Sequence, residues 1–363
     1  MILFAVNSAF QMITAVQLRL TEFKNEFADI IITDEFAHQE KIAEGVIKSG
    51  IFSNVYCVKV KDYHWKNWKF VLCGGIFDRE LTKRLPHIKD RRYDTFLFCN
   101  YAGFTTCLAA YLRKRDHAEL MMFEDGFASY SESWKSRIVD AIQPTSTTER
   151  ILYSLRKKSL YYVTKYWVFN PKLIGDWKIK FSIEKIEKFH ADTINALNKI
   201  YQYNQSVDDY RGVKCIFFEE SYFADGIDVP DLDIVEMISN IVGKENVMIK
   251  IHPRNPYNRF QKLGYKTNQN TEIPWEIIAL NHDFSNTVLI TIASGSSITS
   301  HFVSDTSALK SMLLYDMKEM DRSKLTPTLE VFEKICKSDD YFIFPSDFED
   351  LKRIIHRLVE EIK

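Results

Sequence analysis

A cluster of charged and titratable side chains follows an apolar run near the middle of the second half of the chain. Residues 247–251 are of strand type, and the run ends in Lys250, His252, Pro253 and Arg254. Histidine gives or takes a proton near neutral pH, and the carboxyl ends of parallel strands are where open α/β sheets meet their ligands. The cluster therefore indicates an anion site with His252 as a candidate general acid. Because neighbouring cations lower the pKa of a histidine and a bound phosphate raises it, the acid role requires the ligand.

An acidic turn follows an earlier apolar run. Glu124, Asp125 and Gly126 come directly after residues 120–123, and glycine allows a tight turn with positive φ. We expect both carboxylates to face a ligand cleft, where Asp125 is a candidate general base. A solvated surface turn is the alternative, because Asp-Gly is a common turn dipeptide.

A second acidic segment competes for the role of base. Glu219 and Glu220, followed by Asp225 and Gly226, come after the apolar run 213–218. By composition this segment is a turn, and at a strand end it also lines a cleft. The sequence leaves the choice between Asp125 and this segment open.

Hydroxyl and amide side chains follow two further strands. Ser294, Ser296 and Ser297 come after a run of strand type at 288–292, and Asn7 and Ser8 come after the first strand. Backbone N–H groups at a helix start, together with hydroxyls, form a phosphate-binding nest. The alternative for both segments is a plain helix cap. Walker, G-x-G-x-x-G and kinase signatures are absent from the sequence, and no His/Cys cluster has the spacing of a metal site.

The elements that position these groups alternate between strands and helices. Apolar runs predict strands at residues 2–6, 29–33, 55–60, 95–99, 120–123, 213–218, 247–251, 287–293, 312–315 and 341–344. Helical spacing predicts a helix capped by Ser8 and others at 37–48, 108–113, 183–203, 232–241, 296–302, 329–337 and 348–362. This alternation predicts parallel sheets with helices on both faces. We expect two doubly wound halves, joined by a connector, that face a cleft.

Composition fits a two-domain globular enzyme. The chain has 363 residues, and domains commonly contain about 100–200. Its formal net charge of −1 argues against nucleic-acid binding. Six scattered cysteines without a C-x-x-C pair predict buried free thiols in a reducing compartment. The first residues do not resemble a signal peptide, and no apolar stretch is long enough to span a membrane, so we expect a cytoplasmic protein.

Residues 150–167 are basic and aromatic. Lysines and tyrosine rings of this kind suit the surface of an anionic membrane, which predicts peripheral contact with the inner membrane. An interdomain linker whose aromatic rings pack inward is the alternative. Both interpretations stay open.

The order of the motifs resembles a known family. Glu124-Asp125-Gly126, then His252-Pro253, then the segment 294–297 is similar to the acidic, His-Pro and serine motifs of the bacterial sialyltransferases. Residues 6–11 and 123–130 most resemble glycosyltransferase family 52, which includes lipooligosaccharide sialyltransferases and some glucosyltransferases. The capsule polysialyltransferases are similar too.

This resemblance implies a GT-B fold whose C-terminal half holds most of the donor nucleotide. The domains predicted are residues 1–175 on the acceptor side, a helical connector at 176–210, a donor domain at 211–345 and a terminal helix at 346–363. The resemblance also implies inverting transfer from CMP-sialic acid without a metal or other cofactor, with Asp125 as base and His252 as acid. The predicted substrate contacts are Asn7, Ser8, Glu124, Gly126, Lys250, Pro253, Arg254, Ser294, Ser296 and Ser297.

The function implied is sialylation of a bacterial surface glycan, either lipooligosaccharide or capsule. The partners expected are a nucleotide-sugar donor and a glycan acceptor, and a homodimer is compatible with the sequence. Two alternatives stay open: a UDP-sugar-dependent glucosyltransferase of the same family, and a non-catalytic glycan-binding protein with the same fold.

Overall fold

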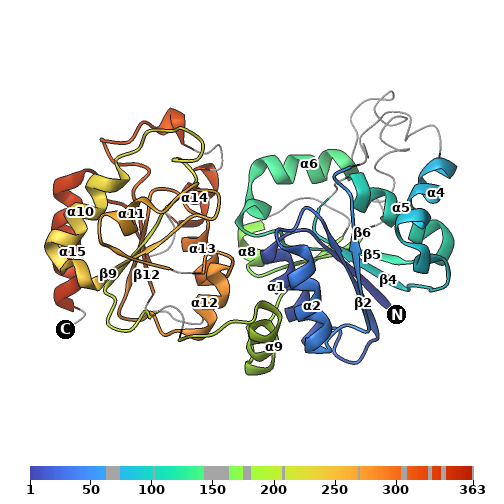
Figure 1. Ribbon diagram of the computed structural model, residues 1–363. Helices are drawn as coiled ribbons and strands as arrows, with labels where there is room; N and C mark the ends of the chain where they lie inside the picture. Colours follow the sequence, from blue (N-terminus) through green and yellow to red (C-terminus); the bar gives the residue numbers. More distant parts are fainter. Residues whose placement is uncertain are drawn as a thin grey trace. The chain divides into compact units, whose positions relative to one another are not determined.

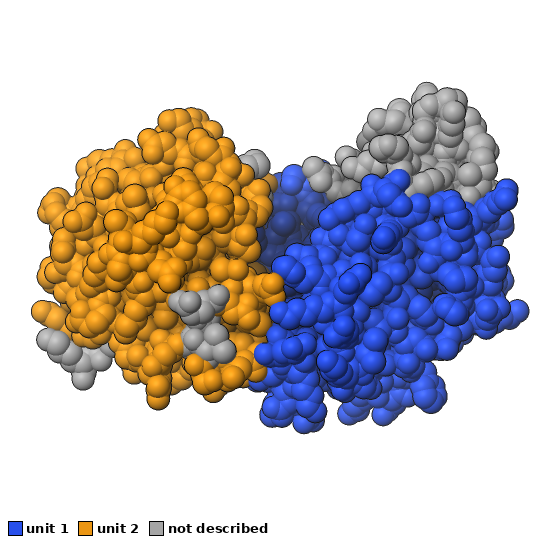
Figure 2. Space-filling view, in the orientation of Figure 1, with its two compact units in different colours: residues 1–202 blue, residues 203–363 orange. Residues whose placement is uncertain are grey.

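The computed structural model divides the chain into two compact units, residues 1–202 and residues 203–363, shown in Figure 2. The structure describes residues 1–62, 74–100, 103–142, 163–174, 181–206, 209–268, 270–303, 309–325, 329–336 and 341–361. Each unit carries its own parallel sheet flanked by helices (Figure 1).

The described part of the first unit contains a seven-stranded parallel sheet in the order β3-β2-β1-β4-β5-β6-β7. The strands are β1 (Ile2–Val6), β2 (Ala28–Thr33), β3 (Asn54–Val58), β4 (Thr95–Phe98), β5 (Glu119–Phe123), β6 (Val163–Val168) and β7 (Ser182–Lys185). The helices are α1 (Ala9–Leu20), α2 (Gln39–Ser49), α4 (Gly74–Arg84), α5 (Gly103–Asp116), α6 (Glu132–Ile142), α8 (Pro171–Ile174) and α9 (Ala191–Tyr201), with short 3-10 turns η1 (Pro86–Lys89) and η2 (Phe127–Tyr130).

The central strands form the core of this unit. Every residue of β1 and β2 is buried, as expected for parallel strands that are covered on both faces. Aromatic rings fill the space around β1, where Phe4 makes edge contacts with Phe23, Phe52 and Phe123. The core is therefore built around the strand that delivers Asn7.

The last two strands of this sheet, β6 and β7, are not predicted from the sequence. Residues 150–162 lie outside the described residues, but the rest of the basic aromatic segment forms β6. Tyr166 and Trp167 are buried there, so at these two positions the prediction of membrane-surface rings is wrong. The helix predicted at 183–203 is also wrong at its start, because β7 occupies Ser182–Lys185 and α9 begins at Ala191.

The described part of the second unit contains a six-stranded parallel sheet in the order β10-β9-β8-β11-β12-β13. The strands are β8 (Cys215–Phe218), β9 (Val247–Lys250), β10 (Lys266–Thr267), β11 (Val288–Thr291), β12 (Lys310–Leu313) and β13 (Phe342–Ile343). The helices are α10 (Asp231–Val242), α11 (Arg259–Lys262), α12 (Trp275–Asn281), α13 (Ser296–Val303), α14 (Leu329–Cys336) and α15 (Phe348–Glu361), with 3-10 turns η4 (Lys244–Asn246) and η5 (Arg322–Lys324).

Strand order reverses once in each sheet. In the first unit the chain moves from β1 outward to β3, then returns to β4 on the other side of β1. In the second unit it moves from β8 outward to β10 and returns to β11. Ligands of open α/β sheets bind beside the carboxyl ends of the strands at such a reversal. We therefore expect ligand-binding residues after β1 and β4 in the first unit, and after β8 and β11 in the second.

Helix contacts complete each unit. In the first unit, α9 packs against both α1 and α2, so the helix within the predicted 176–210 connector is part of the compact unit that ends at residue 202. In the second unit, the terminal helix α15 packs against α10 through a buried face that contains Leu351, Ile355 and Leu358.

Two further observations concern cysteines and membrane spans. Cysteines 99, 215 and 336 are buried and free. Cys57, on strand β3, is exposed, contrary to the prediction of a buried thiol there. Among the described residues, no helix combines the length and the apolar character needed to cross a bilayer.

Gly45 sets the distance between α2 and α9. A Cβ atom at this position would overlap the backbone carbonyl of Ile200, and a backbone atom cannot move aside cheaply. We expect Gly45→Ala to destabilise the protein by about 1–3 kcal/mol, the usual range for overpacking. Urea unfolding measures this effect. Glu44→Ala, an exposed change on the same helix, is the control and should fall within about 0.5 kcal/mol of the parent; equal stability of both variants would contradict the prediction.

Candidate functional site

Asp125 lies directly after β5, half-buried at the carboxyl edge of the first sheet. The Nε2 of Gln11 donates a 2.5 Å hydrogen bond to its Oδ1, and its own backbone N–H donates to the hydroxyl of Ser129. Burial raises the pKa of Asp125 to about 6, against the opposing effect of hydrogen bonds from Gln11 and Asn100. The structure thus holds a carboxylate whose pKa lies near the range suited to a general base.

Polar groups from three other strand ends surround this carboxylate. Asn7 follows β1, Glu35 follows β2 and Asn100 follows β4. The amide of Asn7 donates to Glu35 at 2.8 Å and accepts from Asn100 at 3.5 Å. We call Asn7, Gln11, Glu35, Asn100 and Asp125 the first-unit cluster. It includes groups from both sides of the strand reversal between β1 and β4.

Sequence reasoning found only two members of this cluster, Asn7 and Asp125. Glu35 and Asn100 each stand just after a predicted strand, so the position itself was the available signal. Gln11 lies within α1 on its buried face, and no local pattern separates it from the other buried residues of that helix.

Glu124 points the other way, into the core. It is completely buried, accepts a hydrogen bond from the hydroxyl of Tyr130 and accepts another from the N–H of Phe169 at 2.8 Å. Burial raises its pKa to about 8. The expectation that both carboxylates of this turn face a ligand is therefore wrong for Glu124, because successive residues at a strand end point to opposite sides.

Gly126 and Ser8 support the backbone around Asp125. Gly126 has φ 78°, a conformation that glycine adopts without the penalty of a side chain. Ser8 is the N-cap of α1, and its hydroxyl accepts the N–H of Gln11 at 3.3 Å. The cap interpretation thus accounts for the side chain of Ser8.

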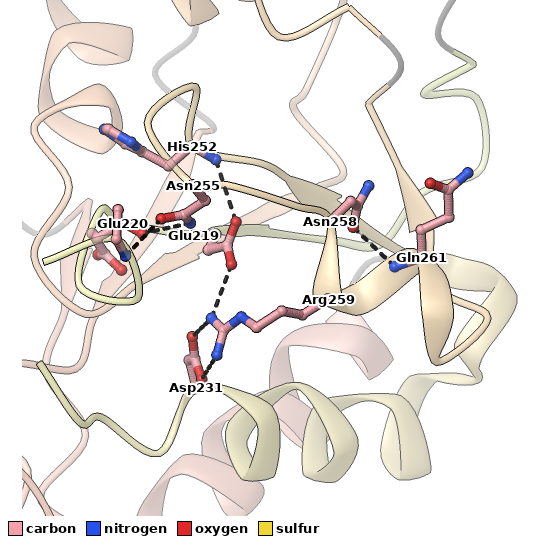
Figure 3. A network of polar contacts seen from close by, with 9 residues as sticks. Glu219, Glu220, Asp231, His252, Asn255, Asn258, Arg259 and Gln261 are labelled. Carbon is pink, nitrogen blue, oxygen red and sulfur yellow. Dashed lines mark hydrogen bonds and ion pairs between the residues drawn. The ribbon is translucent and has the colours of Figure 1, made fainter. Parts of the chain in front are cut away.

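In the second unit, Glu219 anchors the loop that carries the histidine (Figure 3). Its side chain is fully buried and pairs with Arg259 at 2.9 Å, and Arg259 also pairs with Asp231. The other oxygen of Glu219 accepts the backbone N–H of His252 at 3.4 Å. This residue, part of the competing acidic segment, is therefore a buried structural partner of a cation.

His252 is half-buried after the end of β9. Its Nδ1 accepts the backbone N–H of Arg254 at 3.2 Å, so the neutral ring carries its proton on Nε2. Burial lowers the pKa of His252 to about 4, and the cations Arg254 and Lys250 add to this effect. At neutral pH, and without a ligand, His252 is an uncharged hydrogen-bond donor.

The two cations beside His252 have different surroundings. Lys250 is buried at the end of β9, and its charge opposes the burial that raises the pKa of Glu276 on α12. Arg254 is exposed and pairs with Asp225 at 3.1 Å. Pro253 lies between the histidine and the arginine on the surface and ends the strand pattern.

Glu220 ties the end of β8 to the loop that follows β11. Its Oε1 accepts the hydroxyl of Thr291 and the backbone N–H of Ala293, the latter at 2.7 Å. Burial raises its pKa to about 7, although these two hydrogen bonds oppose the shift. Adjacent glutamates at one strand end thus hold the two loops on either side: Glu219 the histidine loop and Glu220 the serine loop.

The serine loop begins α13. The hydroxyl of Ser294 accepts the N–H of Ser296 at 3.3 Å, while the buried Ser297 donates its hydroxyl back to the carbonyl of Ser294. Among the described residues, the N–H of Gly295 and the hydroxyl of Ser296 have no hydrogen-bond partner. The loop therefore offers two donors at a helix start, where negative charge is favoured.

The predicted residues thus gather at the carboxyl edges of two separate sheets. Asn7 and Asp125 belong to one cluster in the first unit. Lys250 ends β9 and His252 follows it, while the serines follow β11, and these two strands lie on either side of β8. In the described part of the chain, no group of three or more His, Cys, Asp or Glu residues is arranged to hold a metal ion.

A comparison with family models identifies the family of this chain. The family model of the alpha-2,8-polysialyltransferases matches residues 2–311, which include both carboxyl edges. The chain belongs to the alpha-2,8-polysialyltransferase family. It is therefore placed among the glycosyltransferases, and the predicted relation to sialyltransferases is confirmed at this level. A search of curated proteins finds no match.

Solved structures confirm the fold. An alpha/beta-galactoside alpha-2,3-sialyltransferase from the luminous marine bacterium Photobacterium phosphoreum is similar with a TM-score of 0.56 and 12% identity, over 94% of this chain and 98% of that one. A UDP-GlcNAc 2-epimerase from Neisseria meningitidis, bound to UDP-GlcNAc, is similar with a TM-score of 0.53 and 11% identity, over 99% and 92%. The predicted GT-B class, with two parallel-sheet α/β domains, is confirmed.

The buried carboxyl of Glu124 generates a prediction about stability and pH. Its pKa in the folded protein, about 8, lies above its ordinary value of 4.5, so the folded state binds this proton more tightly than the unfolded state. Stability therefore falls as pH rises from about 4.5 to about 8, where the folded protein must bury an ionised group.

We expect Glu124→Gln to remove much of this pH dependence. The stability of the variant minus that of the parent should therefore be larger at pH 8 than at pH 5. Thermal unfolding at the two pH values measures it, with Glu132→Gln, an exposed change on α6, as control. A parent and a Glu124→Gln variant with parallel pH dependence would contradict the assignment of Glu124 as a buried titrating group.

Proposed function

We propose that this protein is an inverting sialyltransferase that transfers sialic acid from CMP-sialic acid to a hydroxyl of a bacterial surface glycan. Membership of the alpha-2,8-polysialyltransferase family supports the reaction class. The observation that carries the mechanism is the half-buried Asp125, held by amide groups at the strand reversal of the first sheet, with its pKa raised to about 6. A carboxylate in this state is ionised at neutral pH and still basic enough to take a proton.

Asp125 suits the role of base better than the acidic segment after β8. Glu219 is paired with Arg259 and fully buried. Glu220 accepts a hydrogen bond from the backbone of the serine loop. Asp225 pairs with Arg254 at 3.1 Å. Each member of that segment thus has another partner.

His252 acts on the leaving nucleotide in this proposal. Its Nε2–H is available in the neutral ring, because Nδ1 already accepts a backbone N–H. The negative charge that develops on the leaving phosphate attracts this donor and raises the pKa of the imidazole. The Gly295 N–H and the Ser296 hydroxyl have no partner among the described residues. Together with the charge of Lys250, they supply further prearranged donors to the same charge.

The bond changes follow from these roles. Asp125 removes the proton of the acceptor hydroxyl, the new C–O bond forms, and the bond between the sugar and the CMP oxygen breaks through an oxocarbenium-like transition state. Attack opposite CMP converts a β-linked donor into an α-linked product. Protein groups alone neutralise the phosphate in this scheme.

The finer assignments are also proposals. A lipooligosaccharide or capsule glycan as acceptor, the relation to glycosyltransferase family 52 and peripheral contact with the inner membrane follow from the sequence resemblance and composition. Pro253 and Gly126 shape the backbone and make no contact with the substrate in this proposal. Arg254 breaks its ion pair with Asp225 and binds a phosphate instead.

Removal of the proposed base tests the mechanism directly. We expect Asp125→Asn to lower kcat by about 10²- to 10⁴-fold, and the parent kcat/KM to rise with pH through about 6 as Asp125 ionises. Asp225→Asn is the matched control and should retain most activity, since that carboxylate is tied to Arg254. Greater loss in Asp225→Asn than in Asp125→Asn would transfer the role of base to the second unit.

Nucleotide binding tests the proposed acid and the donor together. Because His252 has a pKa of about 4 in the free protein and a phosphate raises it, CMP binding near pH 5.5 should take up a proton. Calorimetry in buffers of different ionisation enthalpy measures the uptake. We expect it to vanish in His252→Ala but to persist in His301→Ala, a histidine bonded to Ser311.

The same titration with UDP separates the proposed donor from the alternative one. Weaker binding of UDP than of CMP is expected. Preference for UDP would instead favour the UDP-sugar transferase, and binding of neither nucleotide would favour the non-catalytic alternative.

A further inference from the structure

Gln11 is a polar side chain in an apolar place. It lies in the first turn of α1 and is only 2% exposed. A buried amide is costly unless its donor and acceptor groups find partners. The partners of Gln11 therefore indicate why a glutamine occupies this position.

Both ends of its amide are engaged. The Oε1 accepts the backbone N–H of Asn7 at 2.8 Å, and the Nε2 donates to Oδ1 of Asp125 at 2.5 Å. A backbone N–H can only donate, so the oxygen must face Asn7 and the nitrogen must face Asp125. The bond between Ser8 and the N–H of Gln11 fixes the turn that carries this side chain.

We propose that Gln11 is a positioning residue for the transfer reaction, whose amide fixes the Asp125 carboxylate that receives the acceptor proton. This inference rests on the proposed function, which assigns Asp125 as the base. The amide links the backbone at the end of β1 to the carboxylate at the end of β5, across the intervening strand β4.

The charges around Asp125 make this amide important. The titratable groups that face it are Glu35 after β2, Cys99 after β4 and Glu124 of its own segment. Each is neutral or negative, and among the described residues no cation pairs with Asp125. In the described part of the chain, hydrogen bonds from the amides of Gln11 and Asn100 favour its ionised form.

Gln11→Leu removes the amide and keeps a side chain of similar length. We expect the acid limb of the kcat/KM profile to move upward by about one pH unit, because the lost hydrogen bond favoured the charged carboxylate. Activity should fall about tenfold relative to the parent on the acid side of the profile and less at pH 8. The loss should appear in kcat rather than KM.

The same helix provides a matched control. Gln17 is also a buried glutamine of α1, and its Nε2 donates to the carbonyls of Glu187 and Lys188. Gln17→Leu should reduce stability without moving the acid limb. If Gln11→Leu likewise left the acid limb in place and lost the same fraction of activity at every pH, the inference would be overturned.

Gln11→Glu is the second variant, and it carries the test if Gln11→Leu does not fold. It preserves the shape of the side chain and the acceptor for Asn7, but it places a carboxyl group against Asp125. We expect the acid limb to move upward by more than in Gln11→Leu, because like charges raise each other's pKa. An unmoved limb would overturn the inference.

A direct titration separates this inference from the proposed function. With aspartate labelled at the carboxyl carbon, the signal missing in Asp125→Asn identifies Asp125, and its titration midpoint is compared in parent and Gln11→Leu. A higher midpoint in the variant supports the inference even if Asp125→Asn remains active, which would refute only Asp125 as base. An unchanged midpoint refutes the role of Gln11 even if Asp125 is the base.

Discussion

The register of parallel strands is the constraint on which both candidate edges depend. In each sheet, neighbouring strands run in the same direction and end at nearly the same level. Residues far apart in the chain, such as Asn7, Asn100 and Asp125, therefore emerge side by side. The reversal of strand order then separates the loop after β1 from the loop after β4, and the loop after β8 from the loop after β11. Polar groups have room between the two loops of each pair.

Adjacent carboxylates at a strand end serve opposite purposes in both units. Glu124 points into the core and Asp125 to the edge, while Glu219 holds the histidine loop and Glu220 the serine loop. Alternation along an extended backbone produces this division. Burial raises the pKa of Glu124, Asp125 and Glu220. Glu219 forms a buried ion pair with Arg259.

The two edges differ in electrostatic character. The first-unit cluster combines carboxylates with neutral amides, which suits the binding of a sugar hydroxyl and the removal of its proton. The carboxyl edge of the second sheet combines Lys250, a neutral His252 and the start of helix α13. These groups suit the binding of a phosphate. This contrast supports an acceptor role for the first unit and a donor role for the second, in the reaction proposed for this member of the polysialyltransferase family.

The fold class and the positions of the motifs can be predicted from the sequence, because buried parallel strands are continuous apolar runs and polar residues at their ends are visible as interruptions. The sequence does not reveal β6, where Thr164 and Lys165 interrupt the apolar run, or β7, where three of the four residues are polar and none is buried. Tertiary structure alone decided that Glu124 is a core residue, that Glu219 is neutralised by Arg259, and that Gln11 reaches Asp125. Burial and long-range hydrogen bonds set these roles, and both depend on which strands become neighbours, a property that no local window of sequence contains.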